Sequence, residues 1–213
     1  MRRREFLGAA LSSAVALRAS WSAAALAADV GIPAGVKPVA PPLPLSVAIA
    51  AANGKTAQTE AWVDAQIEAA QGLYNPFGVS FRKAETRRLA PAFMRLETRG
   101  DRDGLAAHLR QGHLNVFVVA SLRDVDDPTL YRMGVHWAPN GDLKRQYVIV
   151  SGAARKTTLA HEIGHYFTLQ HTQVADNLMS YQRSGGVVFL NAKQKADVTV
   201  SVRTHVARKL LVP

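Results

Sequence analysis

The chain has 213 residues, of which 48% are hydrophobic, a formal net charge of +10 and no cysteine. This length and composition are those of one globular domain. The absence of cysteine excludes disulfides, cysteine-ligated metals and a thiolate nucleophile. A solvated basic surface explains the charge most simply, although it also suits attraction to acidic substrates or envelope polymers. No nucleic-acid reader motif is present, so we expect no nucleic-acid partner.

The first residues have the pattern of an export signal. Arg3-Arg4-Glu5-Phe6-Leu7 resembles the twin-arginine motif, and an Ala- and Ser-rich stretch follows, interrupted by Arg18. Ala25-Leu26-Ala27 supplies an A-x-A cleavage site. We therefore expect residues 1–28 to be a bacterial signal peptide, with the mature protein periplasmic or secreted and not stably inserted in the membrane. A basic, Ala-rich N-terminal helix is the alternative interpretation.

The mature chain begins with an extended stretch and then a βαβ-type pattern. Residues 29–44 contain five prolines and predict a linker without regular structure, ahead of one domain at residues 45–213. Residues 45–52 are apolar enough for a buried strand, which Asn53-Gly54 ends. A helix follows, with Thr56 or Thr59 as its cap. Its apolar stripe consists of Val63, Ile67, Ala70 and Tyr74.

Further short elements follow along the chain. Predicted strands cover residues 79–84, 115–120, 131–137 and 147–151, and a short helix covers residues 103–110. Residues 131–137 are the best candidate for an edge strand, to which an extended peptide could add by main-chain hydrogen bonds. Near the C-terminus, Asn191 and Gln194 have the spacing of a capping box and predict the start of a last helix.

The most informative segment is His161-Glu162-Ile163-Gly164-His165. On a helix this H-E-x-x-H places two imidazoles one turn apart on the same face, from which both can reach one metal ion. Glu162 lies on the flank of that face, where it can act on a water molecule without being a ligand. His171 can join the pair only if the helix stops soon after His165 and the chain turns back. Leu159, Ile163 and Phe167 lie on the opposite, core-facing side.

Together with Asn177-Leu178-Met179-Ser180-Tyr181, this segment resembles the signature of the metzincin metalloproteases. The interval from His171 to Met179 is similar to that in matrixins, and Met179-Ser180-Tyr181 is similar to the Met-x-Tyr of pappalysins. The resemblance implies one catalytic zinc ion bound by His161, His165 and His171. It also implies Glu162 as general base, Met179 as the floor of the site and Tyr181 as a fifth ligand or oxyanion donor.

The same resemblance implies an α+β zincin fold. In that fold a mixed, mostly parallel sheet with an antiparallel edge strand lies above an active-site helix and a small C-terminal Met-turn subdomain. Thr168 departs from the family pattern, because it stands where glycine usually allows the sharp turn toward the third ligand. A β-branched residue in the left-handed region costs on the order of 1–2 kcal/mol. Either the helix ends with a different geometry, or His171 is a poorer ligand.

The remaining sequence limits the choice of a third ligand. No glutamate follows Glu162, so a downstream glutamate ligand is excluded, and only Asp176, Asp197 and His205 could replace His171. We expect a zinc endopeptidase whose partner is a protein or peptide substrate; the sequence predicts no oligomeric state. Two alternatives stay open: an exported zinc-binding domain that binds peptide or envelope polymer without proteolysis, and a cell-wall amide hydrolase.

Overall fold

A six-stranded, mostly parallel sheet forms the centre of the molecule. The computed structural model describes residues 31–213; the predicted signal peptide and the first two linker residues lie outside them. Strand β1 (Leu43–Ala52) pairs in parallel with β3 (Phe81–Leu89) and with β5 (Leu114–Val119). Strand β8 (Tyr147–Ser151) continues the parallel order beside β5, and β7 (Gly134–Trp137) closes the sheet as an antiparallel edge. The expected fold class is confirmed.

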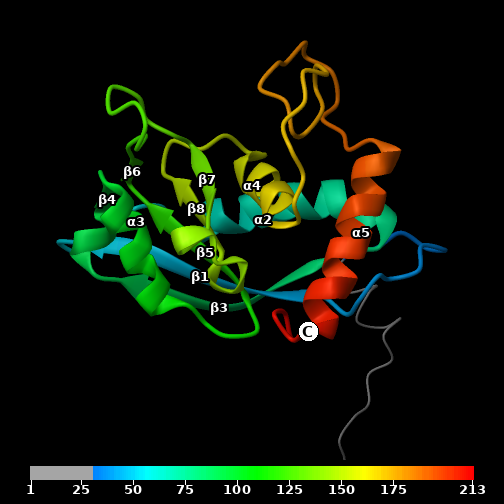
Figure 1. Ribbon diagram of the computed structural model, residues 1–213, viewed down its shortest axis with the longest axis horizontal. Helices are drawn as coiled ribbons and strands as arrows, with labels where there is room; N and C mark the ends of the chain where they lie inside the picture. The colour runs from blue at the N-terminus through cyan, green and yellow to red at the C-terminus, as the bar shows by residue number, and fades with distance from the viewer. Residues whose placement is uncertain (1–30) are drawn as a thin grey trace, which may run out of the picture.

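The inner strands alternate side chains between two buried faces, as strands covered on both sides do. On β5, Val116 and Val118 belong to one hydrophobic cluster, whereas Phe117 and Val119 belong to the other. Figure 1 shows α2 and α4 along one face of the sheet and α3 along the other, with α5 beside the ends of the strands. The helices are α2 (Glu60–Tyr74), α3 (Arg99–Gly104), α4 (Thr158–Tyr166) and α5 (Ala192–Ala207).

The short remaining elements lie at the periphery. A hairpin joins β1 to β2 (Lys55–Thr56), and β4 (Arg95–Leu96) pairs with β6 (Ser121–Leu122) in a separate two-stranded sheet. Five 3₁₀ turns complete the described chain: Asn75–Phe77, Pro91–Met94, Leu105–His108, Pro139–Gly141 and Leu143–Arg145. No helix among the described residues is long and apolar enough to cross a membrane.

Several predicted boundaries need correction. The first strand begins at Leu43 rather than at residue 45, because Leu43 and Pro44 already pair with β3, whereas the pairing with β5 starts at Leu45. Strand β3 extends to Leu89, five residues further than expected. The predicted helix at residues 103–110 is instead α3, which Thr98 and Asp101 start with a capping box, followed by a 3₁₀ turn.

Other local predictions are confirmed. Thr59 caps α2, accepting a hydrogen bond from the backbone N–H of Trp62 at 3.1 Å, and the predicted apolar stripe of α2 is buried. Asn191 and Gln194 form the expected capping box of α5. One further boundary is wrong: the edge strand is shorter than predicted, since only Gly134–Trp137 of residues 131–137 are in the sheet.

Candidate active site

Helix α4 lies across α2, which fixes where it starts. The side chain of Gln66 on α2 bonds to both sides of the α4 N-terminus. Its Nε2 donates to the carbonyl of Arg155 at 2.9 Å, and its Oε1 accepts from the N–H of Leu159 at 3.2 Å. The Tyr74 hydroxyl donates to the carbonyl of Ala160 at 3.0 Å. These buried bonds hold the start of α4 on the core, so the opposite side of the helix is presented to the surface.

Three histidine side chains converge on that opposite side. The Nε2 atoms of His161 and His165 lie 3.1 Å apart, those of His165 and His171 3.0 Å, and those of His161 and His171 3.3 Å. A tetrahedral ion about 2.0–2.1 Å from each nitrogen places such atoms about 3.3–3.4 Å apart. The sequence-predicted triad therefore comes together with a spacing that fits a zinc ion.

The protonation of these rings also suits metal binding. The Nδ1 atom of His161 lies 2.7 Å from the Leu178 carbonyl and that of His165 lies 2.8 Å from the Leu169 carbonyl, so each Nδ1–H donates and leaves the Nε2 lone pair free. Burial, together with the neighbouring His161, lowers the pKa of His165 to about 4. Burial also lowers the pKa of His161 and of His171. Neutral imidazoles are the form that ligates a metal.

The third histidine reaches the site through a left-handed residue. Helix α4 ends at Tyr166, and Thr168 has φ 72°, the conformation that glycine adopts freely. The N–H of Thr168 donates to the His165 carbonyl at 2.8 Å, and the N–H of Leu169 donates to the Gly164 carbonyl at 2.9 Å. Thr168 thus takes the conformation expected of the usual glycine and still directs His171 to the other two rings.

Met179 packs against helix α4. Its side chain is fully buried, and a Cβ added at Gly164 would lie only 2.5 Å from its Sδ. Only glycine at position 164 leaves room for this sulfur against the helix that carries His161 and His165. That Met179 forms the floor of the site stays a prediction.

Glu162 is held next to the triad by the edge strand. A Cβ at Gly134 on β7 would lie 2.8 Å from the Glu162 Cγ, so the absence of a side chain there makes room for the carboxyl group. Burial raises the pKa of Glu162 to about 8, against a hydrogen bond from the backbone N–H of His136 and the charge of Arg132, which lower it. A buried carboxyl group with a raised pKa that lines a cleft is a candidate for general acid–base chemistry.

Tyr181 and His171 are the exposed members of the predicted set. Tyr181 is 71% exposed, with its ring centroid 4.7 Å from that of His171 and 5.8 Å from that of His161. The ring forms part of two cavities that meet at the triad. One cavity, of about 360 Å³, lies beside His161, and the other, of about 610 Å³, lies beside His165 and His171. In Figure 1 two long loops, residues 123–133 and 167–190, rise on either side of α4.

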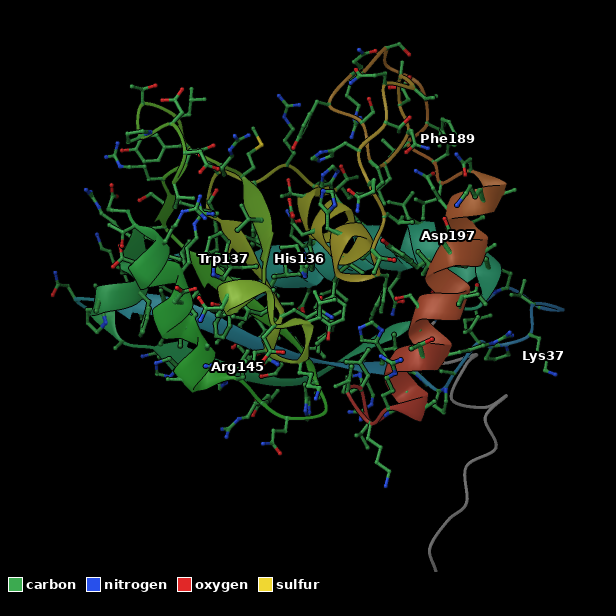
Figure 2. The ribbon with its side chains drawn as sticks, in the orientation of Figure 1. Lys37, His136, Trp137, Arg145, Phe189 and Asp197 are labelled. Carbon is green, nitrogen blue, oxygen red and sulfur yellow. The ribbon has the colours of Figure 1, made fainter. Side chains whose placement is uncertain are left out.

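Two other histidines of the region, His136 and His205, are joined by a chain of hydrogen bonds. His136 on β7 lies beside α4 (Figure 2), with its ring centroid 6.0 Å from that of Tyr166. Its Nε2–H donates to the side-chain oxygen of Gln146 at 2.7 Å, and the Gln146 amide donates to Nε2 of His205 at 2.9 Å. This buried chain ties the edge strand to α5, so His205 is committed elsewhere and does not replace His171.

Sequence reasoning missed the two glycines that shape the site. Gly134 is part of a strand and Gly164 is part of a helix. Glycine in such elements often marks the close approach of another group. That general signal was present, but the groups that approach, Glu162 and Met179, are far away in sequence. The arginines that line the cleft were also missed.

Three solved structures resemble the whole fold. No protein-family model matches the sequence, and no curated protein matches it significantly. Metalloproteinase-II from Bacteroides fragilis matches with a TM-score of 0.54 and 14% identity, over 79% of this chain and 55% of that one. Mature mirolysin from Tannerella forsythia, solved in complex with a cleaved peptide, matches with a TM-score of 0.56 and 12% identity, over 85% and 100%.

The third structure is archaemetzincin from Methanopyrus kandleri, with a TM-score of 0.52 and 18% identity, over 81% of this chain and 99% of that one. The chain has the zincin-type fold of these metalloproteases. It spans about half the length of the Bacteroides fragilis protein, since 55% of that chain is covered. At these identities the likeness establishes the fold, and the chemistry must be argued from the residues of this chain.

Proposed function

We propose that this protein is a zinc-dependent endopeptidase. The observation that supports it most is the convergence of three Nε2 atoms within 3.0–3.3 Å of one another, next to a buried glutamate. The three residues proposed to hold the zinc ion are His161, His165 and His171. When bound, zinc supplies Lewis-acid chemistry, polarising a carbonyl group and making a water molecule acidic near neutral pH.

The remaining steps belong to residues of the chain. Glu162 accepts the proton of the attacking water and passes it to the leaving amine. The Tyr181 hydroxyl donates a hydrogen bond to the oxyanion; its exposed ring is free to swing toward the substrate. The extended peptide adds to β7, which is the last strand of the sheet. On this proposal Tyr181→Phe lowers kcat more than it raises KM.

Two other functions compete with proteolysis. A zinc-binding domain that holds peptide or envelope polymer needs no general base, so the placed and buried Glu162 favours hydrolysis. A cell-wall amide hydrolase would use the same residues; the cleft beside an edge strand suits an extended peptide chain better. Hydrolysis assays with protein, peptidoglycan and small amides separate these functions.

The deciding experiment is metal content and hydrolysis of unfolded casein by the purified full chain and by His171→Ala. We expect one zinc per chain and hydrolysis, both lost or greatly weakened in the variant. Zinc without hydrolysis of any protein would favour the binding function. Absence of zinc would remove the basis of the proposal.

We also propose twin-arginine export of the chain to the periplasm or medium. The support is the segment Arg3-Arg4-Glu5-Phe6-Leu7 alone, which lies outside the described residues. Changing both Arg3 and Arg4 to Lys should trap the precursor in the cytoplasm. Cell fractionation and immunoblotting measure where the protein is found, and normal export of that variant would contradict this proposal.

A further inference from the structure

The cavity beside His161 and Glu162 is lined by three arginines. They reach it from separate segments: Arg132 from just before β7, Arg155 from just before α4, and Arg183 from the chain after Met179. Glu162 is the only carboxylate among the residues that line it. A cavity of about 360 Å³ is large enough to take a substrate side chain.

Within residues 31–213, two of the three guanidinium groups form no ion pair. Arg132 donates to the carboxylate of Asp124, so its charge is compensated. Arg183 is held by carbonyl groups, its Nη1 donating to Ser180 at 2.5 Å and to Gln182 at 3.0 Å, which positions it without neutralising it. Arg155 forms no side-chain ion pair with any residue in the described range 31–213.

This cationic lining is concentrated on one side of the triad. The cavity beside His165 and His171 has Arg132 as its one arginine and is otherwise lined by residues such as Val135, Leu143 and Gln170. A generally basic surface would place cations on both sides. The concentration of arginine beside His161 therefore belongs to that cavity.

We propose that this cavity is a specificity pocket for a carboxylate next to the scissile bond. The inference rests on the proposed peptidase function and adds a substrate class: peptides with an aspartate or glutamate side chain, or a terminal carboxylate, at that position. Arginine binds carboxylates with two parallel hydrogen bonds, which gives both affinity and orientation. The same unbalanced charges disfavour a lysine or arginine side chain in the pocket.

The test uses quenched fluorescent peptides with both ends capped, carrying Glu, Gln or Lys on either side of the cleaved bond. Loss of a charge-assisted hydrogen bond predicts kcat/KM about tenfold or more higher for Glu than for Gln, with Lys lower still. A second set compares a free with an amidated C-terminus close to the cleaved bond. Preference for the capped Glu peptide assigns the pocket to a side chain, and preference for the free end assigns it to the terminus.

Variants connect the preference to the pocket. Arg155→Gln should lower kcat/KM for the Glu peptide much more than for the Gln peptide and so remove most of the Glu preference. Arg155→Glu should shift the preference toward Lys, a gain that misfolding cannot produce. Lys156→Gln is the matched control, an exposed neighbouring cation that does not line the cavity. Arg183→Gln applies the same test to the lining arginine that follows Met179 in the chain.

Failure of the inference differs from failure of the peptidase function. Hydrolysis at equal rates for Glu, Gln and Lys peptides would overturn the carboxylate pocket and leave the peptidase intact. If no peptide and no casein is cleaved, fluorescence anisotropy of the labelled Glu and Lys peptides on Glu162→Ala decides the pocket. Tighter binding of the Glu peptide, abolished by Arg155→Gln, supports it, and equal binding of the two peptides overturns it.

Discussion

The candidate site is built from two regions that are specified in different ways. Helix α4 carries His161, Glu162 and His165, whose mutual placement follows from one turn of helix. The return segment, which we define as residues 167–190, carries His171, Met179 and Tyr181 without forming any helix or strand beyond an isolated bridge. The helix needs only local hydrogen bonds, whereas the return segment depends on contacts with distant parts of the chain.

A buried contact joins the return segment to α5, and hydrogen bonds within the segment complete its support. The side chains of Asn177 and Gln194 form two reciprocal amide hydrogen bonds of 2.8 and 3.0 Å, which join the return segment to α5. The N–H of Leu178 donates to the carbonyl of Phe189 at 2.7 Å, near the start of α5 (Figure 2). The carboxylate of Asp176 accepts from the N–H groups of Ser184 and Gly186. Irregular backbone can position a ligand when its polar groups are satisfied in this way.

The largest effect is expected on the helical side, from Glu162→Ala. Loss of a general base lowers kcat by about 10²–10⁴-fold. Because Glu162 is not among the three converging nitrogens, zinc content should stay at the wild-type value. Casein hydrolysis and metal analysis on one preparation check both points. Near-normal hydrolysis would exclude the role assigned to this glutamate.

The next effect concerns the strand that supports the glutamate. In Gly134→Ala the new Cβ would lie 2.8 Å from both Glu162 Cγ and Thr158 Cγ2, which displaces the carboxyl group. Misplacement of a catalytic group by about 1 Å can cost about 10²-fold in rate. We expect kcat to fall by about 10²-fold. Gly134→Ala should also lower the unfolding free energy less when Glu162 is already alanine, because the Cγ atom that the new Cβ meets is then absent. Equal destabilisation in both backgrounds would refute this contact.

The contact between the two regions is tested by Gly164→Ala. The added methyl group meets the buried Met179 sulfur at 2.5 Å, and overpacking of this kind costs about 1–3 kcal/mol of unfolding free energy. The matched control is Gly72→Ala on α2, where the added Cβ has no neighbour within 4 Å. That control should stabilise the protein by about 1 kcal/mol, as alanine does in a helix. Urea denaturation measures both changes. If the two variants shifted the unfolding free energy in the same direction, the contact between Gly164 and Met179 would be contradicted.

The long-range support of the return segment is tested by Gln194→Ala. Leaving the buried Asn177 amide without its partner costs about 1–3 kcal/mol. The variant also loses the bond that the N–H of Asn191 donates to the Gln194 side chain, which weakens the capping of α5. Lys195→Ala, on the same helix and without a side-chain hydrogen bond, is the control. We expect weaker zinc retention in Gln194→Ala, because Asn177 also accepts from the N–H of Met179 at 2.9 Å. Unchanged unfolding free energy and zinc affinity would show that this link is not needed.

The smallest effect is a gain, expected from Thr168→Gly. Glycine removes the strain of the left-handed conformation but adds chain entropy to the unfolded state, leaving a gain of about 1 kcal/mol or less. Thr168→Ala keeps a Cβ and the positive φ, so it should give no such gain. Thermal or urea denaturation of the three proteins decides the matter, and an equal gain in both variants would point to the side chain instead of the backbone.

Much of the fold was predictable because its elements carry local signals. The stripe of α2, the Thr59 cap and the Asn191–Gln194 capping box are patterns within a few residues of one another, and all are present. The length of β3 and the short β7 were not predicted correctly, since strand ends depend on where a neighbouring strand stops pairing. The zincin class itself came from the resemblance of a short motif.

The sequence by itself determined which residues form the site: the helical spacing of His161 and His165, the flanking glutamate, and a third histidine able to return. Tertiary structure alone decided that Thr168 adopts a left-handed conformation, that Gly134 and Gly164 make room for Glu162 and Met179, and that arginines gather on one side of the triad. The physical reason is distance along the chain. A helix repeats its geometry every turn, whereas close approaches between separate segments depend on how the whole core packs.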